Sequence, residues 1–272
     1  MTAQVTVAIQ GERGAYSEEA ALALFGPEAV IVPCRTLHDV FLTLDQGHAD
    51  AAAVPVENSR AGTIVETYDN LLAHDYPVTG EYRLRVRHCL LGLPGAELGG
   101  IRRAYSHPQA LSQCRRFLEG HGIVAESAYD TAGSAADLAG RADRAAAAIA
   151  SRRAGELFGL AILAEGIEDR QDNVTRFLAV AAPPTLPPGP GRTLLAFTVR
   201  NEPKALYRCL GPFAKHDCNL SKIESRPDLE TPFDYVFYLD VDGRADDPGV
   251  ARAIAELAEI ASSCRVLGSF GG

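Results

Sequence analysis

The hydrophobic positions along residues 6–182 predict short buried strands that alternate with amphipathic helices. Apolar runs at 6–10, 31–32 and 51–54 are typical of buried strands, and each precedes a stretch with helical spacing, at 18–25, 37–46 and 63–72. The alternation continues with strands at 83–93, 124–128, 145–150 and 178–182 and helices at 106–118, 135–139 and 151–158. This order predicts an α/β fold built on open parallel sheets, with a second lobe that starts near residue 83.

A proline-rich stretch at 183–191 ends this pattern. It can neither continue a helix nor join the middle of a sheet, so it marks a linker between domain 1–182 and domain 192–272. The second domain shows strands at 193–199, 219–225, 233–241 and 264–270 and helices at 203–213 and 250–261. The order βαββαβ is that of a small ferredoxin-like domain. Its open sheet face and edge favour pairing with a second copy.

Composition and charge limit the possible partners. The 272 residues are 47% hydrophobic and 22% charged, which is typical of a soluble globular protein. The formal charge of -9 repels phosphate backbones, so we expect no nucleic-acid partner. Neither a leader nor a long uncharged apolar run is visible, which predicts a cytoplasmic protein without membrane insertion. The six cysteines form no Cys-x-x-Cys pair and are interpreted as reduced core residues rather than metal ligands.

The most prominent candidate chemistry lies at 172–178, directly before the apolar segment 178–182. Asn173, Thr175 and Arg176 place an amide, a hydroxyl and a guanidinium at the mouth of a buried strand. Loops at such positions commonly hold ligand-binding groups in α/β proteins. The structural alternative is an Asx-type turn before an ordinary strand.

Two earlier stretches admit both a functional and a structural interpretation. The glycine loop at 11–17 could expose backbone N–H groups to an anion, or it could be a plain βα turn with Ser17 as the helix N-cap. Glu57, Asn58 and Ser59 follow the strand 51–54, at the end where open α/β sheets bind ligands. Thr63 and Glu66 then have the spacing of a helix capping box.

A third such stretch is Ser106-His107-Pro108-Gln109, at the start of the predicted helix 106–118. The interval from Ser106 to Gln109 is again that of a capping box, and proline is favoured in a first helical turn. His107 is interpreted as a solvated helix-start residue, with an acid–base role as the alternative.

Five motifs in order along nearly the whole chain resemble the prephenate dehydratase family. They are Gly-x-x-Gly-x-Tyr-Ser at 11–17, Pro-x-Glu-Asn-Ser at 55–59, His-Pro-Gln-Ala-Leu at 107–111, Asn-x-Thr-Arg-Phe at 173–177 and Glu-Ser-Arg-Pro at 224–227. The resemblance implies two catalytic lobes like those of a periplasmic-binding protein, followed by an ACT regulatory domain. It implies a hydro-lyase of phenylalanine biosynthesis that converts prephenate to phenylpyruvate without metal or cofactor and is inhibited by phenylalanine.

The same resemblance implies roles for individual residues. Thr175 would donate a hydrogen bond to the departing oxygen, Arg176 would hold a carboxylate or brace the loop, and Phe177 would pack beside the substrate ring or in the core below it. The catalytic set is completed by Glu57, Asn58 and Ser59. The implied substrate-binding residues are Tyr16, Ser17, Ser106, Gln109 and Asn173. The implied phenylalanine site comprises Lys204, Ala205, Leu206, Asn219, Leu220, Glu224, Ser225 and Arg226.

Two departures from the family pattern bear on specificity. Lys204 stands where the ACT ligand-binding turn usually has glycine, so phenylalanine could bind differently or weakly. The stretch Gln171-Asp172-Asn173-Val174 resembles arogenate-using relatives, and a carboxylate at Asp172 would favour the ammonium group of arogenate.

Several alternatives therefore stay open. One is an arogenate dehydratase or dual-substrate cyclohexadienyl dehydratase with the same fold. Another is a two-lobed amino-acid sensor without catalysis, and a third is a decarboxylase that retains the hydroxyl group. The family forms dimers and tetramers, which the sequence does not distinguish.

Overall fold

The computed structural model describes residues 4–183, 190–227 and 235–271. The chain divides into two compact units, residues 1–68 with 82–177 and residues 69–81 with 178–272. The predicted linker at 183–191 lies largely outside the described residues. No helix in the described part of the chain is long and apolar enough to span a membrane.

The first lobe is built on parallel strands covered by helices. Strand β1 (Thr6–Gln10) pairs in parallel with β2 (Val30–Cys34) and with β3 (Ala51–Asn58). Strand β11 (Val174–Ala181) follows β3 in the sheet, and β5 (Val78–Arg85) follows β11. The connecting helices are α1 (Tyr16–Phe25), α2 (Leu37–Asp45) and α3 (Val65–Ala73). The apolar spacing of α2 buries Leu37, Val40, Phe41 and Leu44, as predicted.

The second lobe contains a five-stranded sheet in the order β10-β6-β9-β7-β8. The strands are β6 (Cys89–Gly92), β7 (Arg103–Ser106), β8 (Val124–Ser127), β9 (Ala146–Ala150) and β10 (Ala161–Glu165). The helices are η1 (Leu98–Gly100), α4 (Pro108–Gln113), α5 (Arg115–His121), α6 (Thr131–Ala139) and α7 (Arg152–Phe158).

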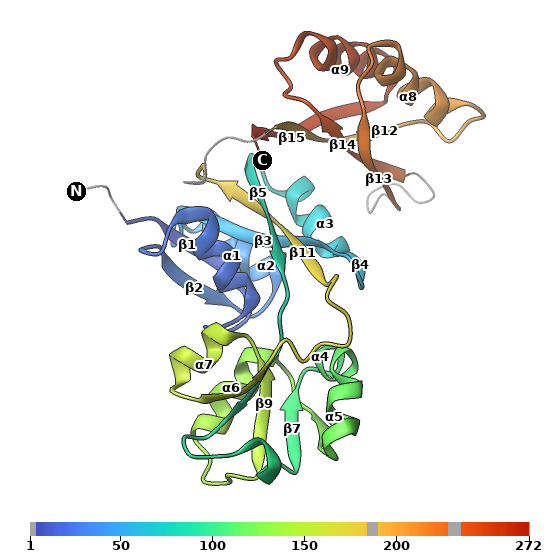
Figure 1. Cartoon of the computed structure of the whole chain (residues 1–272). Coiled ribbons are helices and arrows are strands. Elements are labelled where there is room, and N and C mark those ends of the chain that lie inside the picture. Colours follow the sequence, from blue (N-terminus) through green and yellow to red (C-terminus); the bar gives the residue numbers. More distant parts are fainter. Residues whose placement is uncertain (1–3, 184–189, 228–234, 272) are drawn as a thin grey trace. The chain divides into compact units, whose positions relative to one another are not determined.

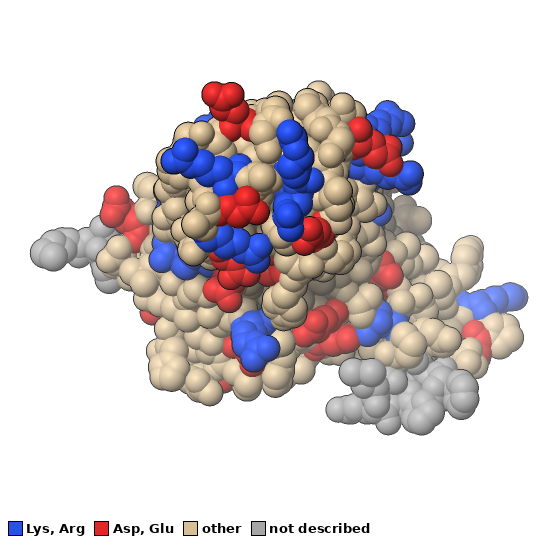
Figure 2. Space-filling model, turned by 90° about the horizontal axis from the view of Figure 1, so that it is seen from below, with Lys and Arg blue, Asp and Glu red and all other residues tan. Residues whose placement is uncertain are grey.

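Consecutive residues of this sheet face opposite cores, which is why its strands read as continuous apolar runs. Leu90 and Ile149 pack with residues of α4 and α5, whereas Leu91 and Ala148 pack with residues of α6 and α7. Basic and acidic side chains are interspersed on the face of the molecule shown in Figure 2.

The C-terminal domain is the predicted βαββαβ unit. Its elements are β12 (Gly191–Thr198), α8 (Ala205–Lys215), β13 (Leu220–Pro227), β14 (Tyr235–Asp242), α9 (Pro248–Ile260) and β15 (Ser263–Gly271). The strand order is β13-β14-β12-β15, with antiparallel pairing. Both helices lie on one face of the sheet (Figure 1), over a core that includes Phe197, Phe213 and Leu239.

The C-terminal domain contacts residues 69–81, which belong to the same compact unit. Gly268 of β15 pairs with Val78 of β5, and a Cβ atom at Gly268 would lie 2.1 Å from the Val78 carbonyl oxygen. The Arg265 guanidinium donates to the carbonyl oxygens of Leu72 and His74 at 2.9 and 2.8 Å. It thereby satisfies free carbonyl groups at the end of α3.

Two local predictions about helix starts, the caps at Ser17 and Ser106, were wrong. Helix α1 begins at Tyr16, after Ala15 in extended conformation, so Ser17 is not its N-cap. Thr63 lies in the short strand β4 (Gly62–Thr63), which pairs with the end of β3. Helix α4 is capped by the ring of His107, which accepts from the Gln109 N–H. The predicted single helix 106–118 is interrupted at Cys114, where α4 ends and α5 follows.

Candidate active site

Both lobes of the first unit line a cavity of about 250 Å³. Its wall combines amides and hydroxyls with small apolar side chains: Tyr16, Asn58, Ala61, Ile64, Val86, His88, His107, Gln109, Ala110, Gln113, Thr131, Asn173 and Thr175. A neighbouring cavity of about 460 Å³ shares three of these residues, Tyr16, His107 and Thr131. The larger space adds Ser17, Arg35 and Ala132, among others.

Two strand ends deliver the central polar groups. Asn58 is the last residue of β3, and Thr175 is the second residue of β11. Ser59 holds the two ends together, because its N–H donates to the Val174 carbonyl at 2.9 Å and its hydroxyl donates to the Asp172 carbonyl at 2.7 Å. The motifs around residues 58 and 175 are thus brought side by side by the sheet.

The orientation of the Asn58 amide follows from its backbone partners. Its Oδ1 accepts the N–H groups of Arg60 and Ala61, both at 2.9 Å. The Nδ2 group must therefore face the other way, where it donates to Asn173 Oδ1 and to Thr175 Oγ1, both at 2.8 Å. Since the Thr175 oxygen accepts from Asn58, its own proton is directed elsewhere and can serve a ligand in the cavity.

The same reasoning assigns every proton along the rest of the network. Asn173 Nδ2 donates to Gln113 Oε1 at 2.7 Å. This oxygen also faces His88 Nε2 at 2.9 Å, so Nε2 carries the imidazole proton. His88 Nδ1 is then an acceptor 2.8 Å from the Tyr16 hydroxyl, which shares its single proton between this nitrogen and the Arg87 carbonyl at 2.9 Å. His88 is buried, and burial lowers its pKa, which keeps the ring neutral.

The wall of the smaller cavity is thus a set of neutral hydrogen-bonding groups held in fixed orientations. Asp, Glu, Lys and Arg are absent from its lining in the described part of the chain. Its free hydrogen-bonding groups include the Thr175 hydroxyl, the Gln113 N–H groups, the Gln109 amide and the Thr131 hydroxyl. Such a site can stabilise a departing oxygen by donation, whereas a carboxylic acid tuned near neutral pH is missing from the wall.

The glycine loop at 11–17 serves packing between the lobes. The carboxylate of Glu18, fully buried, accepts the Gly14 N–H at 2.7 Å. It is paired with Arg13 of its own lobe at 2.9 Å and with Arg153 of α7 at 3.2 Å. The hydroxyl of Ser151 also donates to the Gly14 carbonyl at 2.6 Å. The Gly14 N–H is therefore taken by a side chain of the protein itself, while Gly11, Ala15 and Ser17 still line the cavity of about 460 Å³.

Several residues of the predicted site do not line the cavity. The Ser106 hydroxyl is fully buried and donates to the Ile149 carbonyl at 2.7 Å. Phe177 packs in a core cluster with Ala20 and Leu84. Arg176 is buried as well, Glu57 pairs with Thr63 in the β3–β4 hairpin, and Ser59 braces the strand ends. These residues support the site from behind.

Asp172 is also outside the lining of the cavity. Its carboxylate is largely exposed and forms an ion pair with Arg60. The hydrogen bond from Arg60 lowers the pKa of Asp172, so its charge is neutralised by a neighbouring guanidinium. The expectation that this carboxylate would meet a substrate ammonium group has no geometric basis here.

Three polar lining residues were not anticipated from the sequence: His88, Gln113 and Thr131. Gln113 follows Gln109 by four residues on α4, so helical spacing places both amides on one face, and this signal was available. His88 lies in the irregular segment between β5 and β6, and Thr131 opens α6. Their position depends on how the second lobe faces the first.

The predicted phenylalanine site falls into separate places in the C-terminal domain. Lys204 caps α8 beyond the end of β12, in the left-handed conformation with φ 70°. Asn219 donates to Asp242, which pairs with Arg192 at the start of β12. Eight residues of strand separate these two positions, or roughly 23 Å. One chain therefore does not bring Asn219 and Leu220 together with Lys204, Ala205 and Leu206.

The last part of that set lies on β13, the edge strand of the sheet. Glu224 and Ser225 belong to this strand, and Arg226 forms an ion pair with Asp69 of α3 at 2.6 Å. A cavity of about 590 Å³ lies at the start of α8, and Ala205 is the one residue of the predicted set that lines it.

Comparison with known proteins gives a consistent family assignment. Residues 7–185 match the model of the prephenate dehydratase domain, and residues 193–259 match that of the ACT domain. The chain is 42% identical over 279 residues to "Arogenate dehydratase/prephenate dehydratase 2, chloroplastic" of Arabidopsis thaliana, covering 98% of this chain and 73% of the relative.

Two solved structures resemble the whole chain. A prephenate dehydratase of Arthrobacter aurescens in complex with L-Phe has a TM-score of 0.88 at 35% identity, covering 98% of this chain and 90% of the other. A protein described as a novel type of quorum quenching acylase has a TM-score of 0.90 at 36% identity, covering 98% of both chains. Because the domain model matches most of the chain and the motifs around Asn58 and Thr175 meet in one cavity, the chain belongs to the prephenate dehydratase family, with a C-terminal ACT domain.

Proposed function

We propose that this chain converts prephenate to phenylpyruvate, CO2 and water, with Thr175 as the group that assists departure of the ring hydroxyl. The observation that carries the proposal is the hydrogen bond from Asn58 Nδ2 to Thr175 Oγ1. It leaves the Thr175 proton as a donor at the wall of a cavity shared by the two lobes.

The reaction needs few groups from the protein. Cleavage of the bond between the ring and its carboxylate releases CO2, and the electron pair enters the ring while the C–O bond at the opposite carbon breaks. The hydroxide takes one proton, supplied by solvent, and leaves as water. Thr175 is too weak an acid to supply that proton by itself, so it stabilises the developing negative charge by hydrogen bonding. Aromatisation of the ring provides the driving force.

The wall of the cavity suits the two ends of prephenate differently. Ile64, Val86 and Ala110 give the smaller cavity an apolar side, where a ring carboxylate is poorly solvated and loses CO2 more readily. The larger cavity contains Arg35 and Ser17, which suit the pyruvyl carboxylate, alongside the carboxylates of Glu12 and Asp130, the second of which caps α6. Gln109, Gln113 and Asn173 provide the remaining neutral contacts.

Regulation by L-phenylalanine belongs to the same proposal. The residues implied for the effector lie at opposite ends of β12 within one chain, so two chains are needed to bring them together. In the described residues, the edge strand β13 pairs only with β14 and exposes Ile223. A second copy placed along this edge would complete both the sheet and the effector site, in a homodimer or in a homotetramer built from two such dimers. A cytoplasmic location is part of the proposal and agrees with six unpaired cysteines.

Two other activities, turnover of arogenate and acylase activity, can be distinguished from prephenate dehydration by assay. Arogenate differs from prephenate only in carrying an amino group, and a relative is named for both substrates. The purified protein should therefore be given each substrate alone, with and without phenylalanine, while phenylpyruvate and phenylalanine are quantified. Acylase activity should be measured in parallel, because one of the similar structures is described as a quorum quenching acylase.

The outcome that supports the proposal is aromatic product from prephenate, inhibited by phenylalanine and lost in Thr175→Val. Faster turnover of arogenate would assign the chain to arogenate dehydratases. Tight binding of either substrate without product would indicate a sensor, and a non-aromatic decarboxylated product would indicate the related decarboxylase.

A further inference from the structure

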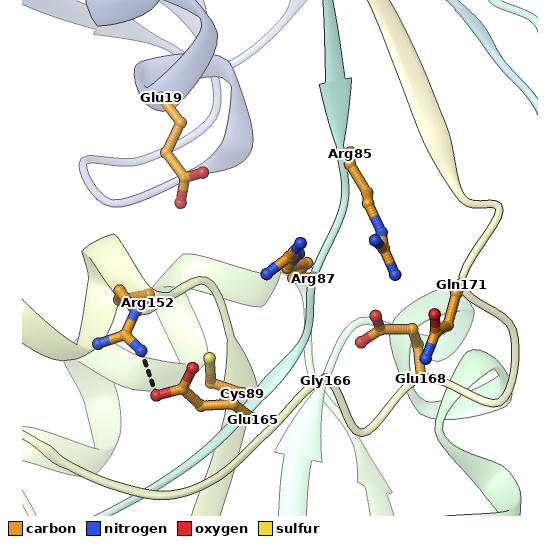
Figure 3. Close-up of a pocket in the computed structure, with 9 residues that line it drawn as sticks. All are labelled: Glu19, Arg85, Arg87, Cys89, Arg152, Glu165, Gly166, Glu168 and Gln171. Carbon is orange, nitrogen blue, oxygen red and sulfur yellow. Dashed lines mark hydrogen bonds and ion pairs between the residues drawn. The ribbon is translucent and has the colours of Figure 1, made fainter.

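We propose that the cavity behind the segment joining the two lobes is a second ligand site, which binds a small dicarboxylate. This cavity has a volume of about 560 Å³ and is lined by Glu19, Arg85, Arg87, Cys89, Arg152, Glu165, Gly166, Glu168 and Gln171 (Figure 3). None of these residues belongs to the lining of the proposed substrate cavities. The inference rests on binding geometry and does not depend on the proposed catalytic activity.

The segment from Arg85 to Cys89 separates the two sites. Val86 and His88 line the substrate-side cavity, whereas Arg85, Arg87 and Cys89 line the cavity behind it. This is the alternation of an extended chain, in which successive side chains point to opposite sides. One short segment therefore presents apolar and imidazole groups to the substrate side and two guanidinium groups to the other side.

The cavity is open to solvent and is lined by residues of both lobes and of the two connections between them. Gly166, Glu168 and Gln171 belong to the returning connection between β10 and β11, and they lie across from the Arg85–Cys89 segment (Figure 3). Glu19 comes from α1 of the first lobe and Arg152 from α7 of the second. A ligand here would contact both lobes and both connections at once.

The charges of the cavity favour an anion with two negative groups. Arg152 is already paired with Glu165, and Glu168 accepts the His88 N–H at 3.0 Å. In the described part of the chain, Arg85 and Arg87 have neither a hydrogen bond nor an ion pair from their guanidinium groups. The third carboxylate of the lining is Glu19, whose pKa is raised by burial.

The spacing of the two arginines selects the kind of anion. Alternate residues of an extended strand lie about 6.6 Å apart. Each guanidinium can bind one carboxylate in a bidentate manner, so the match is to two separate carboxylates on a short carbon chain rather than to one compact phosphate. The same segment contacts the substrate side, because the Arg87 carbonyl accepts the Tyr16 hydroxyl at 2.9 Å and the His88 ring faces Gln113. Occupancy should therefore alter the KM for prephenate.

The test uses the full-length protein with succinate, glutarate, adipate and inorganic phosphate as probes. Binding is measured by calorimetry and by the shift in melting temperature, with acetate and sodium chloride at matched ionic strength as controls. The variants are Arg85→Gln, Arg87→Gln and the double variant. The matched control is Arg83→Gln, which removes an arginine from the same strand outside the cavity lining.

The expected result is one dicarboxylate bound per chain, at least tenfold weaker binding in the double variant, and unchanged binding in Arg83→Gln. Four results would overturn the inference. The first two are binding no stronger than in the matched salt control, and equal dicarboxylate affinity in the wild type and the double variant. The other two are tighter binding of phosphate than of every dicarboxylate, and simple competition between dicarboxylate and prephenate that the arginine variants leave unchanged. The last result would place the probe in the substrate cavity.

Discussion

Replacement of Asn58 by aspartate is the sharpest test of how the site orients Thr175. The change Asn58→Asp keeps the side-chain shape and the acceptor for the N–H groups of Arg60 and Ala61. It replaces the Nδ2 donor by an oxygen, which then faces Thr175 Oγ1 and Asn173 Oδ1 across 2.8 Å. The threonine hydroxyl must now donate to the new carboxylate, and its proton is no longer available to the substrate.

The size of the effect follows from the loss of one hydrogen-bond donor to a developing oxyanion, which reduces kcat by about 10²- to 10³-fold. Steady-state kinetics with prephenate would measure it, and KM should change much less than kcat. Circular dichroism should show a preserved fold, with a loss of about 1–2 kcal/mol in the free energy of unfolding, because Asn173 Oδ1 loses its donor.

A double variant makes this test specific. If Asn58 acts through Thr175, then Thr175→Val should be nearly as inactive alone as in combination with Asn58→Asp, because the two groups act as a unit. The introduced carboxyl should also regain a proton at low pH, so the activity of Asn58→Asp relative to wild type should rise as the pH falls. The reasoning fails if Asn58→Asp keeps more than a fifth of the wild-type kcat, or if the two losses multiply.

Three further predictions concern stability and pH. Glu18→Ala should lower the free energy of unfolding by about 3 kcal/mol in denaturant titration, because it leaves Arg153 and the Gly14 N–H without their buried partner; Glu119→Ala, from an exposed pair on α5, should cost less than about 0.5 kcal/mol. Lys204→Gly should raise stability by about 0.5–1 kcal/mol by relieving its positive φ, whereas Lys204→Ala, which keeps the strain, should not. Burial lowers the pKa of His88 below its ordinary 6.5, so the unfolded chain binds this proton more readily than the folded protein. The wild-type protein should therefore lose stability as the pH falls below 6.5. His88→Gln should remove this contribution to the pH dependence of the melting temperature.

The sequence alone determined the order of elements, because that order depends on local periodicity. Helical spacing in 37–46 and strand alternation in 193–199 each report a buried face that neighbouring residues create together. The domain order, with a βαββαβ unit at the end, followed from the same local signals. The motif containing Asn58 was identified for a similar reason, since ligand groups collect at the carboxyl ends of parallel strands, whereas Thr175 was identified as a polar group at the start of a buried strand.

The tertiary structure decided which polar groups face the substrate and which only support it. In the sequence, Ser106 and Gln109 are the two residues of a predicted capping box, and both were predicted to bind substrate. In the structure, the Ser106 hydroxyl donates to the Ile149 carbonyl, while Gln109 lines the cavity. Glu18, whose carboxylate binds the glycine loop, is paired with Arg153, which lies 135 residues away in the chain. Hydrogen bonds between such distant residues depend on how the lobes pack, and local sequence carries no record of that packing. The proton positions along Asn58, Asn173, Gln113 and His88 were decided only by this long-range network.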